Sequence, residues 1–580
     1  MRRIFRLTLL LTALHLTTAA QTIRPEEYIY PIRDVAGLYS ANFGEMRPGH
    51  FHAGVDIKTE GVEGKPVVAV MDGYISRVVV QAGGYGRAVY LTLKNGTTAV
   101  YGHLQHFTEE MDDHIRRERY RRRSNSVDLW FTPERFPVRQ GDIVGYSGNS
   151  GSSSGPHLHF ELRNSSDQSL RNPVREGIIT PRDTLPPRFM KLHYVEIDTL
   201  ANGIPMRSER ASYDVIRSAS GGYRLTRQEP LPVGRKGYFI AEVTDRRNGV
   251  QNVFAVYRLK GWLDGIPYFE FRLDTFTFGI SRTCDAVSCY PLQLGSRNEV
   301  IRMAQLEGAP DQFYPVMVDR GLVRTQPNEQ RTVEMEIEDD CGNRSTLRFE
   351  IVGSEEHFTA TPPADSLAVP MRVKYAATLR ADESFSAHIP KGALYDGQYL
   401  KAEAGTVPAV DSGTIVLTPA YRCFDDPCTP LFKPITVTLR AYVPKELQSK
   451  TVMALRNRNG RAASAGGRYK EGEVTISTRT VGDWFLAADT LAPTIRPQFT
   501  ATTNLTANKQ LIFRVGDNFT GVASWRLEID GEWVPCDRYP SRGQLVWHID
   551  RPMEGRTHQA TLTVRDGVGN EQQWEGSFRW

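Results

Sequence analysis

The strongest constraint on the fold is the run at residues 145–162, where a segment rich in glycine and serine leads into alternating apolar residues. After Pro156 the chain reads histidine, leucine, histidine, phenylalanine, glutamate and leucine. This period of two is typical of a β-strand, so His157, His159 and Glu161 are predicted to face the same side. The pattern suits a metal site, and it also occurs where two surface histidines lie on an edge strand.

A second group of polar residues lies at 51–57. His52, Gly54 and Asp56 alternate with apolar residues, which places them on one face of an extended segment. The glycine is predicted to leave room for an ion held by His52 and Asp56. With the first strand this gives three nitrogen or oxygen ligands and a spare histidine. Three protein ligands and an open position for water are typical of catalytic zinc.

Five separated blocks follow the order of a known family. They are H-x-G-x-D at 52–56, two glycine-containing segments within 64–73, G-Y-G at 84–86, Y-G-H-L at 101–104, and the run that ends at 161. Over residues 40–175 the chain therefore resembles the LytM/lysostaphin-type zinc endopeptidases of bacterial cell walls, peptidase family M23.

The resemblance implies roles for individual residues. His52, Asp56 and His159 are expected to bind Zn²⁺, while His103 and His157 act beside the metal as catalytic residues. A small antiparallel β-fold with the metal in a groove on the sheet is also implied. Glu161 is expected either to accept a hydrogen bond from an imidazole N–H or to face solvent.

The first 20 residues predict a secretory signal peptide. Arg2, Arg3 and Arg6 precede an apolar run at 7–16, and small residues follow at 18–20. The mature chain is expected to start at Gln21, where no cysteine offers a site for a lipid anchor. No later stretch approaches about 20 apolar residues. We expect export to the periplasm or cell envelope without a membrane-spanning segment.

Length and composition set further limits. A chain of 580 residues with 40% hydrophobic residues is too long for one core, so several domains are expected. The net charge of +4 gives no reason to expect nucleic-acid binding, which needs a concentrated basic surface. Among six cysteines, Cys284 with Cys289 and Cys423 with Cys428 are close enough to form disulfides in an oxidising compartment.

Repeated motifs indicate two copies of one β-domain. The segment that starts at Asp183 recurs at Asp489. A Val-x-Asp motif that ends at Asp245 recurs at 515–517, with the same spacing to a following Gly-Val pair. Asp339 before Gly-Asn recurs as Asp566. Short alternating strands with Gly, Asn and Asp turns favour an immunoglobulin-like sandwich.

The predicted fold class is therefore mainly β, with an antiparallel LytM-type peptidase domain followed by immunoglobulin-like β-sandwich domains. The predicted parts are a signal peptide at 1–20, the peptidase domain at 21–182, an immunoglobulin-like domain with insertions at 183–353, a β-rich domain at 354–488, and the repeated immunoglobulin-like domain at 489–580.

Two regions lack a catalytic motif. The charged segment at 108–136, rich in arginine from 116 to 123, is predicted to be a helical insertion. It is expected to be a solvated surface helix or a lid with an anion-binding rim. Residues 354–488 are expected to act as a spacer, and binding to a wall polymer or a partner protein stays open.

The predicted function is that of an exported zinc-dependent endopeptidase acting on the peptide cross-links of bacterial peptidoglycan. For a directly cross-linked wall the resemblance favours the bond from D-alanine to diaminopimelate. The alternatives are a non-catalytic wall-binding protein or activator, and a scaffold that uses the domain as a binding module. The intact histidines and aspartate count against loss of catalysis.

Overall fold

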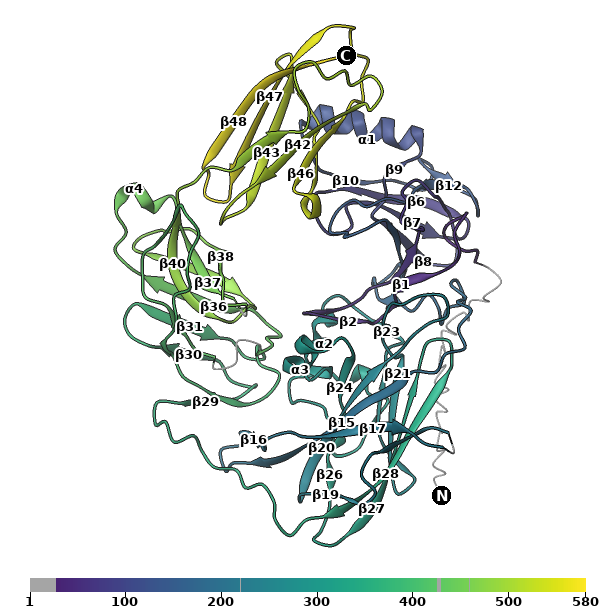
Figure 1. The fold of residues 1–580 in the computed structure, drawn as a ribbon, viewed down its shortest axis with the longest axis vertical. Coiled ribbons are helices and arrows are strands. Elements are labelled where there is room, and N and C mark those ends of the chain that lie inside the picture. The colour runs from purple at the N-terminus through teal and green to yellow at the C-terminus, as the bar shows by residue number, and fades with distance from the viewer. Residues whose placement is uncertain (1–27, 220, 425–428, 458) are drawn as a thin grey trace, which may run out of the picture.

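The computed structural model describes residues 28–219, 221–424, 429–457 and 459–580 (Figure 1). The predicted signal peptide lies outside the described residues. Strands dominate the described chain and pair almost entirely antiparallel, which confirms the prediction of a mainly β protein. Among the helices described, none has the length and apolar character needed to cross a membrane.

The N-terminal region is built on one sheet with the strand order β1-β4-β13-β8-β7-β6-β10. A smaller sheet, β5-β12-β9, lies beside it. The elements of this region are β1 (Tyr39–Ala41), β2 (Met46–Arg47), β3 (His50–Phe51), β4 (Val55–Lys58), β5 (Pro66–Val68), β6 (Gly73–Val80), β7 (Arg87–Leu93), β8 (Thr97–Gly102), β9 (His106–Phe107), α1 (Glu109–Arg122), β10 (Val127–Trp130), β11 (Pro137–Val138), β12 (Ile143–Tyr146), β13 (His157–Asn164) and β14 (Leu170–Arg171).

The hairpin of β7 and β8 forms where the sequence predicts a turn. Thr92 pairs with Thr98, and the tight connection between the strands contains Asn95 and Gly96. Gly96 has φ 81°, a left-handed conformation that suits glycine. Because β13 lies between β4 and β8, residues from three separate sequence blocks come together at the centre of the sheet.

The hydrophobic core of this sheet continues into the next region of the chain. Phe276 packs on Phe43 and Phe51, with ring centroids 5.1 and 5.5 Å apart. Phe313 also contacts Phe51, at 5.3 Å. Strand β23 (Thr275–Phe276) extends the N-terminal sheet by pairing with β14. The N-terminal region therefore depends on residues beyond Arg182 for part of its core.

The second region and the C-terminal region share a pattern of strand pairing. In the second region β15 pairs with β20, β20 with β24, β21 with β22 and β27, and β27 with β28. In the C-terminal region β41 pairs with β42, β42 with β46, β43 with β44 and β47, and β47 with β48. These pairings follow the same order in both regions, although they belong to one continuous sheet in the second region and to two separate sheets in the C-terminal region.

In the C-terminal copy, β42, β43, β46 and β47 contribute side chains to one hydrophobic core, so its two sheets pack face to face. The main elements of both copies are β15 (Arg188–Thr199), β16 (Pro205–Arg207), β17 (Ala211–Arg217), β18 (Tyr223–Leu225), β20 (Lys236–Thr244), β21 (Arg258–Leu263), β22 (Ile266–Arg272), α2 (Cys284–Val287), α3 (Tyr290–Gly295), β24 (Glu299–Arg302), β27 (Gln330–Glu338), β28 (Arg344–Gly353), β41 (Thr494–Pro497), β42 (Gln510–Gly516), β43 (Val522–Ile529), β44 (Glu532–Val534), β45 (Asp537–Tyr539), β46 (Gln544–His548), β47 (Thr557–Asp566) and β48 (Glu571–Arg579).

The third region has its own hydrophobic core, centred on Trp484 and Phe385, whose rings stack at 6.0 Å. Its main elements are β29 (Val369–Met371), β30 (Ala377–Arg380), β31 (Phe385–Ile389), β32 (Gln398–Leu400), β35 (Tyr421–Arg422), β36 (Ile435–Arg440), α4 (Lys445–Gln448), β37 (Thr451–Arg456), β38 (Ala462–Gly466), β39 (Glu473–Thr478) and β40 (Asp483–Asp489). The exact domain limits stay a prediction.

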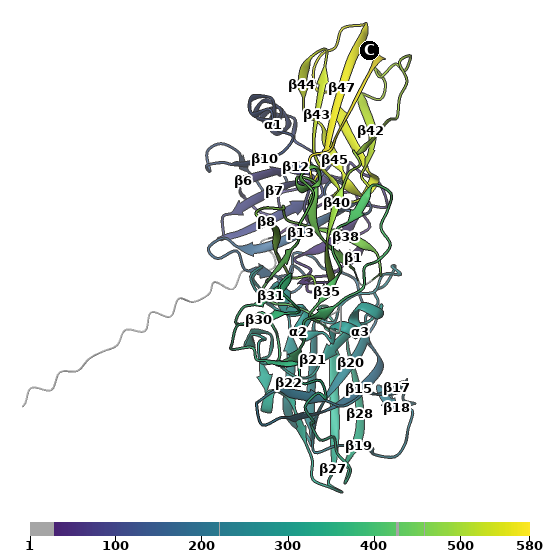
Figure 2. The same cartoon turned by 90° about the vertical axis from the view of Figure 1, so that its left-hand side faces the viewer.

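The chain follows a closed circuit, because the C-terminal region returns to helix α1 of the N-terminal region (Figures 1 and 2). Asp537 pairs with Arg87 and Arg119, at 2.6 Å to each guanidinium. Tyr120 donates a hydrogen bond to Asp550 at 2.9 Å. The helix predicted within 108–136 is thus present, but it is neither fully solvated nor a lid. It supports the C-terminal region, and none of its residues lines the cavity around the histidines.

The predicted disulfide between Cys284 and Cys289 is wrong, because both cysteines are free. Cys284 begins α2 and is buried, with its Sγ 3.5 Å from the carbonyl oxygen of Arg47. Cys289 packs against a different hydrophobic cluster that contains Val195. The two thiols therefore belong to separate cores. Cys428, the partner predicted for Cys423, lies outside the described residues.

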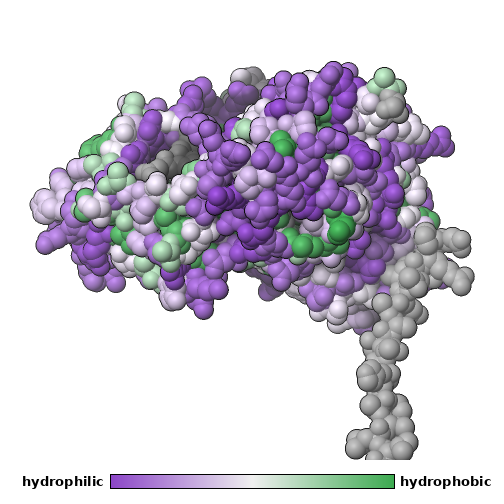
Figure 3. Space-filling view, turned by 90° about the horizontal axis from the view of Figure 1, so that it is seen from below, coloured by the Kyte–Doolittle hydropathy of each residue, from purple (hydrophilic) through white to green (hydrophobic). Residues whose placement is uncertain are grey.

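The face shown in Figure 3 is mainly hydrophilic, with apolar residues in small separate patches. Scattered apolar side chains of this kind are normal on the surface of a folded protein.

Candidate metal centre and active site

Two of the three predicted metal ligands lie on adjacent strands, and the third, His52, lies in the link between β3 and β4. His159 on β13 is in register with Asp56 on β4, and on its other side with Gly102 at the end of β8. His103 directly follows β8, and His157 begins β13. The antiparallel register therefore brings together four of the five predicted site residues, although they are up to about 100 positions apart in the sequence.

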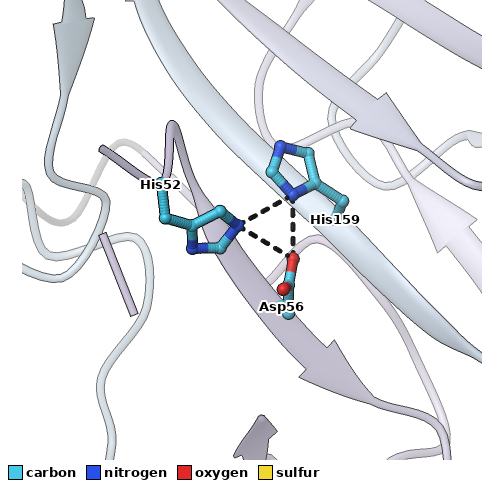
Figure 4. Close-up of side chains that lie close together, drawn as sticks. All are labelled: His52, Asp56 and His159. Carbon is cyan, nitrogen blue, oxygen red and sulfur yellow. Dashed lines mark hydrogen bonds and ion pairs between the residues drawn. The ribbon is translucent and has the colours of Figure 1, made fainter. Parts of the chain in front are cut away.

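The donor atoms of His52, Asp56 and His159 converge on one point (Figure 4). Nε2 of His52 lies 3.2 Å from Nδ1 of His159 and 3.2 Å from Oδ1 of Asp56. Nδ1 of His159 lies 2.8 Å from the same carboxylate oxygen. All three residues are buried, with 3%, 7% and 5% of the residue surface exposed.

This geometry fits a zinc ion. Ligand atoms about 2.0–2.1 Å from a tetrahedral zinc ion lie roughly 3.3 Å apart, close to the spacing of these three atoms. Two imidazoles and a carboxylate are also a donor set that zinc accepts. In addition, Nδ1 of His52 is 2.8 Å from the carbonyl oxygen of Asn42, which orients Nε2 toward the other two ligands.

Glu161 orients the second imidazole. Its Oε1 lies 2.8 Å from Nε2 of His159 and accepts a hydrogen bond of 2.5 Å from the hydroxyl of Tyr85. Glu161 is fully buried, so it does not face solvent, the other expectation from the sequence. Burial acts to raise the pKa of Glu161, but Arg163 and His159 outweigh it and lower that pKa to about 2. The carboxylate thus stays charged.

The carboxylate of Asp56 is also surrounded by groups that favour its negative charge. Burial acts to raise the pKa of Asp56, yet His52 and His159 hold it well below its usual value. Arg47 adds an ion pair, with Nη2 3.1 Å from Oδ2 of Asp56. Oδ1 faces the imidazoles while Oδ2 faces the guanidinium, so the two oxygens of Asp56 have separate partners.

The two predicted catalytic histidines lie beside the ligands. The ring of His103 is 4.7 Å from that of His157 and 5.8 Å from that of His159, between centroids. Nδ1 of His103 lies 2.8 Å from the carbonyl oxygen of Ser150, and Nδ1 of His157 lies 2.8 Å from that of Gly155. A backbone oxygen can only accept a hydrogen bond, so the N–H group of each neutral imidazole must be at Nδ1. Nε2 of the same ring then carries no proton and can accept one from a substrate.

The backbone at His103 is held in an unusual conformation. Its φ of 59° is in the left-handed region, which costs a non-glycine residue energy. The backbone N–H of His103 donates to the carbonyl oxygen of Tyr85 at 2.8 Å, and the imidazole is fixed by Ser150. Burial and then the neighbouring imidazoles lower the pKa of His103 to about 3, so this ring is neutral.

The glycine between His52 and Asp56 has a different role from the predicted one. The chain is not one strand at 51–57, since β3 ends at Phe51 and β4 begins at Val55. A Cβ atom on Gly54 would lie 2.2 Å from the carbonyl oxygen of Phe160. Glycine is needed here because the backbone of β13 passes very close, and not because it leaves space for an ion.

Three parts of the chain line the cavity at the histidines, which has a volume of about 870 Å³. The N-terminal region supplies the metal centre and Arg47, the second region supplies Phe278 and Arg282, and the third region supplies Phe432 and Arg479. Residues 354–488 are therefore more than the predicted spacer, because they form part of the wall.

Sequence reasoning missed several of these residues. Tyr85 was visible within the G-Y-G block, and its link to Glu161 follows only from the fold. Arg47 lies nine residues before Asp56 and had no motif to mark it. Arg282 and Arg479 reach the cavity from other regions, and no local pattern distinguishes them from surface arginines.

Comparison with known families gives two matches along the chain. Residues 50–120 match the family described as Peptidase family M23. Residues 371–489 match the family described as Zu5-like domain. The first match contains His52, Asp56 and His103, and the second covers the region that contributes Phe432 and Arg479.

Two curated relatives resemble part of the chain. The DD-carboxypeptidase/endopeptidase Mpg of Neisseria meningitidis serogroup B is 32% identical over 133 residues, which are 23% of this chain and 24% of the relative. An uncharacterised metalloprotease of Haemophilus influenzae is 34% identical over 119 residues, 20% of this chain and 19% of the relative. The chain thus spans about a quarter or less of the length of these relatives.

Solved structures with a similar part include the catalytic domain of the prophage-encoded M23 protein EnpA of Enterococcus faecalis. It has 27% sequence identity, covers 25% of this chain and 95% of that domain, and gives a TM-score of 0.19. The catalytic domain of lysostaphin from Staphylococcus simulans has 26% identity over 23% of this chain and 85% of that domain, with a TM-score of 0.16.

Proposed function

The N-terminal region of this chain is a LytM-type domain of peptidase family M23, and on that premise we propose that the protein is an exported zinc-dependent endopeptidase. Its substrate is the peptide cross-link of bacterial peptidoglycan. The names of the relatives, a DD-carboxypeptidase/endopeptidase and a metalloprotease, support a peptidase acting on such peptides.

One observation carries this proposal. The donor atoms of His52, Asp56 and His159 lie within 3.2 Å of one another and face a cavity, with two further histidines beside them. Two imidazoles and one carboxylate would hold the zinc ion and leave a position open on the cavity side. When bound, zinc polarises a carbonyl group and makes water more acidic, which is the chemistry needed to hydrolyse an amide near neutral pH.

His103 and His157 transfer the protons of the reaction. One neutral imidazole accepts at Nε2 a proton of the water that attacks the carbonyl carbon of the scissile amide. As the C–N bond breaks, the imidazolium formed in this way returns the proton to the leaving amine. The backbone oxygens of Ser150 and Gly155 keep both rings in the tautomer that this transfer needs.

The walls of the cavity favour an anionic peptide. Arg47, Arg282 and Arg479 all line it, and guanidinium groups bind carboxylates well. A stem whose terminal carboxylate is free would be held by charge, while the amide of the cross-link lies at the histidines. Because the walls come from three regions, the substrate site needs the second and third regions as well as the N-terminal domain.

Digestion of purified peptidoglycan tests the proposal. The mature chain from Gln21 is loaded with one equivalent of zinc and incubated with cross-linked muropeptides, and the products are identified by mass spectrometry. We expect cross-linked dimers to be converted to monomers, and a chelator to stop the reaction. Zinc-loaded protein that leaves the dimers intact would show that the domain binds the wall without cutting it.

A point variant separates an enzyme from a scaffold better than a truncation. Deletion of the N-terminal region would expose Phe276 and Phe313, which pack on Phe51, so it would damage the second region too. His157→Ala changes one partly exposed side chain at the cavity. If a cell that carries this variant shows the same wall phenotype as one that lacks the protein, the activity of the site is what the cell needs.

A further inference from the structure

The two copies of the repeated β-domain each bring three aspartates together. In each group, carboxylate oxygens of the three residues lie within 4.8 Å of one another. These aspartates come from the three motifs that repeat in the sequence, and none belongs to the histidine site. The first group is Asp183, Asp245 and Asp339, and the second group is Asp489, Asp517 and Asp566.

The third aspartate has the same surroundings in both groups. Oδ1 of Asp339 accepts hydrogen bonds from the backbone N–H groups of Cys341 and Asn343. Its Oδ2 accepts a hydrogen bond from the side-chain amide of Asn343. In the second copy, Oδ1 of Asp566 accepts the N–H groups of residues 568 and 570, and Oδ2 accepts the amide of Asn570. The repeated motif is thus a repeated three-dimensional unit.

The first aspartate lies at a junction between regions in both groups. Asp183 follows the N-terminal region, and Asp489 ends β40 of the third region. The side-chain amide of Asn343 donates to the backbone oxygen of Asp183, and that of Asn570 donates to the backbone oxygen of Asp489. Each group therefore connects a junction to the turns of the β-domain that follows.

Asp245 is the reason to infer a ligand. It is fully buried, with 0% of its surface exposed, and neither of its carboxylate oxygens has a hydrogen-bond partner among the described residues. Oδ2 of Asp183 is buried without a partner too, and so is Oδ1 of Asp517 in the second group. A buried carboxylate without a partner is costly, so such groups indicate a missing cation or a retained proton.

The positive charge of a neighbouring arginine does not remove the energetic cost of burying the Asp245 carboxylate. Arg247 is the guanidinium next to the first group, and it is also buried. Its Nη2 binds Oδ1 of Asp340, and its guanidinium lies over the ring of Phe254 at 4.7 Å. Burial and then Asp339 raise the pKa of Asp245 to about 9, despite the opposing effect of Arg247.

We propose that each aspartate group binds one divalent cation of the calcium class. Calcium takes carboxylate and carbonyl oxygens at about 2.3–2.6 Å, so oxygens on opposite sides of the ion are separated by roughly 5 Å. The three carboxylate oxygens of each group fall within that limit, and the unpartnered oxygens of Asp245 and Asp517 supply free ligands. Such an all-oxygen set favours calcium over zinc.

The position of the sites gives them a structural role. A cation at the first group ties the end of the N-terminal region to the second region, whose Phe278 and Arg282 line the histidine cavity. A cation at the second group ties the third region to the C-terminal region, whose Asp537 binds Arg119 on α1. Calcium would therefore stiffen the junctions that close the circuit of the chain.

Calcium titration of the full-length mature protein tests this proposal. The protein carries one equivalent of zinc, is freed of calcium on a chelating resin with zinc restored, and is titrated with CaCl₂ in a calorimeter. We expect two calcium ions per chain and a rise in the thermal midpoint. Wild-type protein that binds no calcium would mean that Asp245 keeps a proton instead, and would overturn the proposal.

Single substitutions assign the sites. Asp245→Asn is expected to bind one calcium ion fewer, and so is Asp517→Asn. Each variant that keeps the full stoichiometry overturns the proposal for its own group. The matched control is Asp214→Asn, an exposed strand residue outside both groups, which should bind two ions like the wild type.

The stability of Asp245→Asn in calcium-free buffer distinguishes a ligand from a residue that only supports the fold. Replacing a buried carboxyl group that has no hydrogen-bond partner should leave the calcium-free variant as stable as the wild type or more stable. Adding calcium should then raise its midpoint less than it raises that of the wild type. The assignment of Asp245 as a calcium ligand would be contradicted if Asp245→Asn were less stable than the wild type without calcium and if calcium raised the midpoints of both proteins equally.

Discussion

At the scale of single residues, the histidine site is defined by what each ring nitrogen faces. Nδ1 of His159 points to the other ligands while its Nε2 points to Glu161, and His52 has the reverse arrangement with Asn42 behind it. Nε2 of His157 lies 3.6 Å from Oδ1 of Asp56, farther than the imidazole nitrogens of His52 and His159, and neither His157 nor His103 belongs to the converging group. Ligands and proton carriers are thus separable by substitution.

We predict that His159→Ala loses both zinc and activity, because one of the three ligands is gone. His157→Ala should keep one zinc per chain, while its kcat falls by about 10²–10⁴, the usual contribution of a general acid or base. Zinc is measured by mass spectrometry of the metal and turnover by hydrolysis of muropeptide dimers. Loss of zinc from His157→Ala would show that His157 is a ligand.

Glu161→Gln is predicted to weaken zinc binding by about 10–100-fold, because the carboxylate that orients His159 is replaced by a neutral amide. A chelator competition measures this affinity. The control is Glu134→Gln, which changes an exposed loop residue in the same region. Equal zinc affinity of wild type and Glu161→Gln would mean that Glu161 supports the fold without tuning the metal.

At the scale of elements, β13 is the organising strand. It pairs with β4 on one side and with β8 on the other, and it carries His157, His159 and Glu161. The link between β3 and β4 passes so close to β13 that only glycine fits at position 54. The distance between the strands therefore decides whether His52 and Asp56 reach His159.

Gly54→Ala is predicted to lower the free energy of unfolding by about 1–3 kcal/mol, the usual range for overpacking, and to reduce zinc occupancy. The new methyl group would collide with the carbonyl oxygen of Phe160, the neighbour of His159. Denaturant unfolding and metal analysis measure both effects. Gly155→Ala, which meets open space near the same cavity, should change neither; similar results for the two variants would refute the close-approach argument.

At the scale of the whole molecule, the contact between α1 and the C-terminal region closes the circuit seen in Figure 1. Asp537 lies between the guanidinium groups of Arg87 and Arg119, and all three side chains are largely buried. A buried aspartate shared by two arginines makes this contact depend strongly on one carboxylate.

Asp537→Ala is predicted to weaken this contact by about 3–5 kcal/mol, because it leaves two buried guanidinium groups without their partner. The C-terminal region should then separate from α1, which small-angle X-ray scattering would detect as a larger radius of gyration. Glu532→Gln, an exposed change in the same region, serves as the control. A compact Asp537→Ala protein would show that other contacts suffice.

The same carboxylate predicts a pH dependence. Burial acts to raise the pKa of Asp537, but Arg119 and Arg87 hold it below its usual value. A pKa that is lower in the folded protein adds stability above the unfolded value of about 3.9, and that stability is lost as the pH falls further. The stability difference between wild type and Asp537→Asn, measured by urea unfolding, should be constant above about pH 5 and shrink below about pH 4. A constant difference down to pH 3 would contradict this.

Much of the histidine site could be predicted from the sequence, because most of its residues lie within short segments whose pattern is visible locally. The alternation at 157–161 determines which side chains share a face of the strand, and the spacing at 52–56 does the same for His52 and Asp56. The repeated aspartate motifs likewise predicted a repeated β-domain, and the strand pairings of the two copies match. Short-range periodicity and spacing therefore predicted a mainly β chain and the faces that carry the polar residues, and the resemblance to the LytM/lysostaphin-type family implied which of these residues are ligands.

The tertiary structure alone decided what depends on contacts between distant segments. Arg282 and Arg479 line the cavity from positions more than 100 and 300 residues beyond His159, and Asp537 meets Arg119 across 418 positions. The role of Gly54 and the separation of Cys284 from Cys289 also follow from packing. No sequence pattern encodes such contacts, because each depends on how whole sheets pack, which the chain determines only through the sum of its interactions.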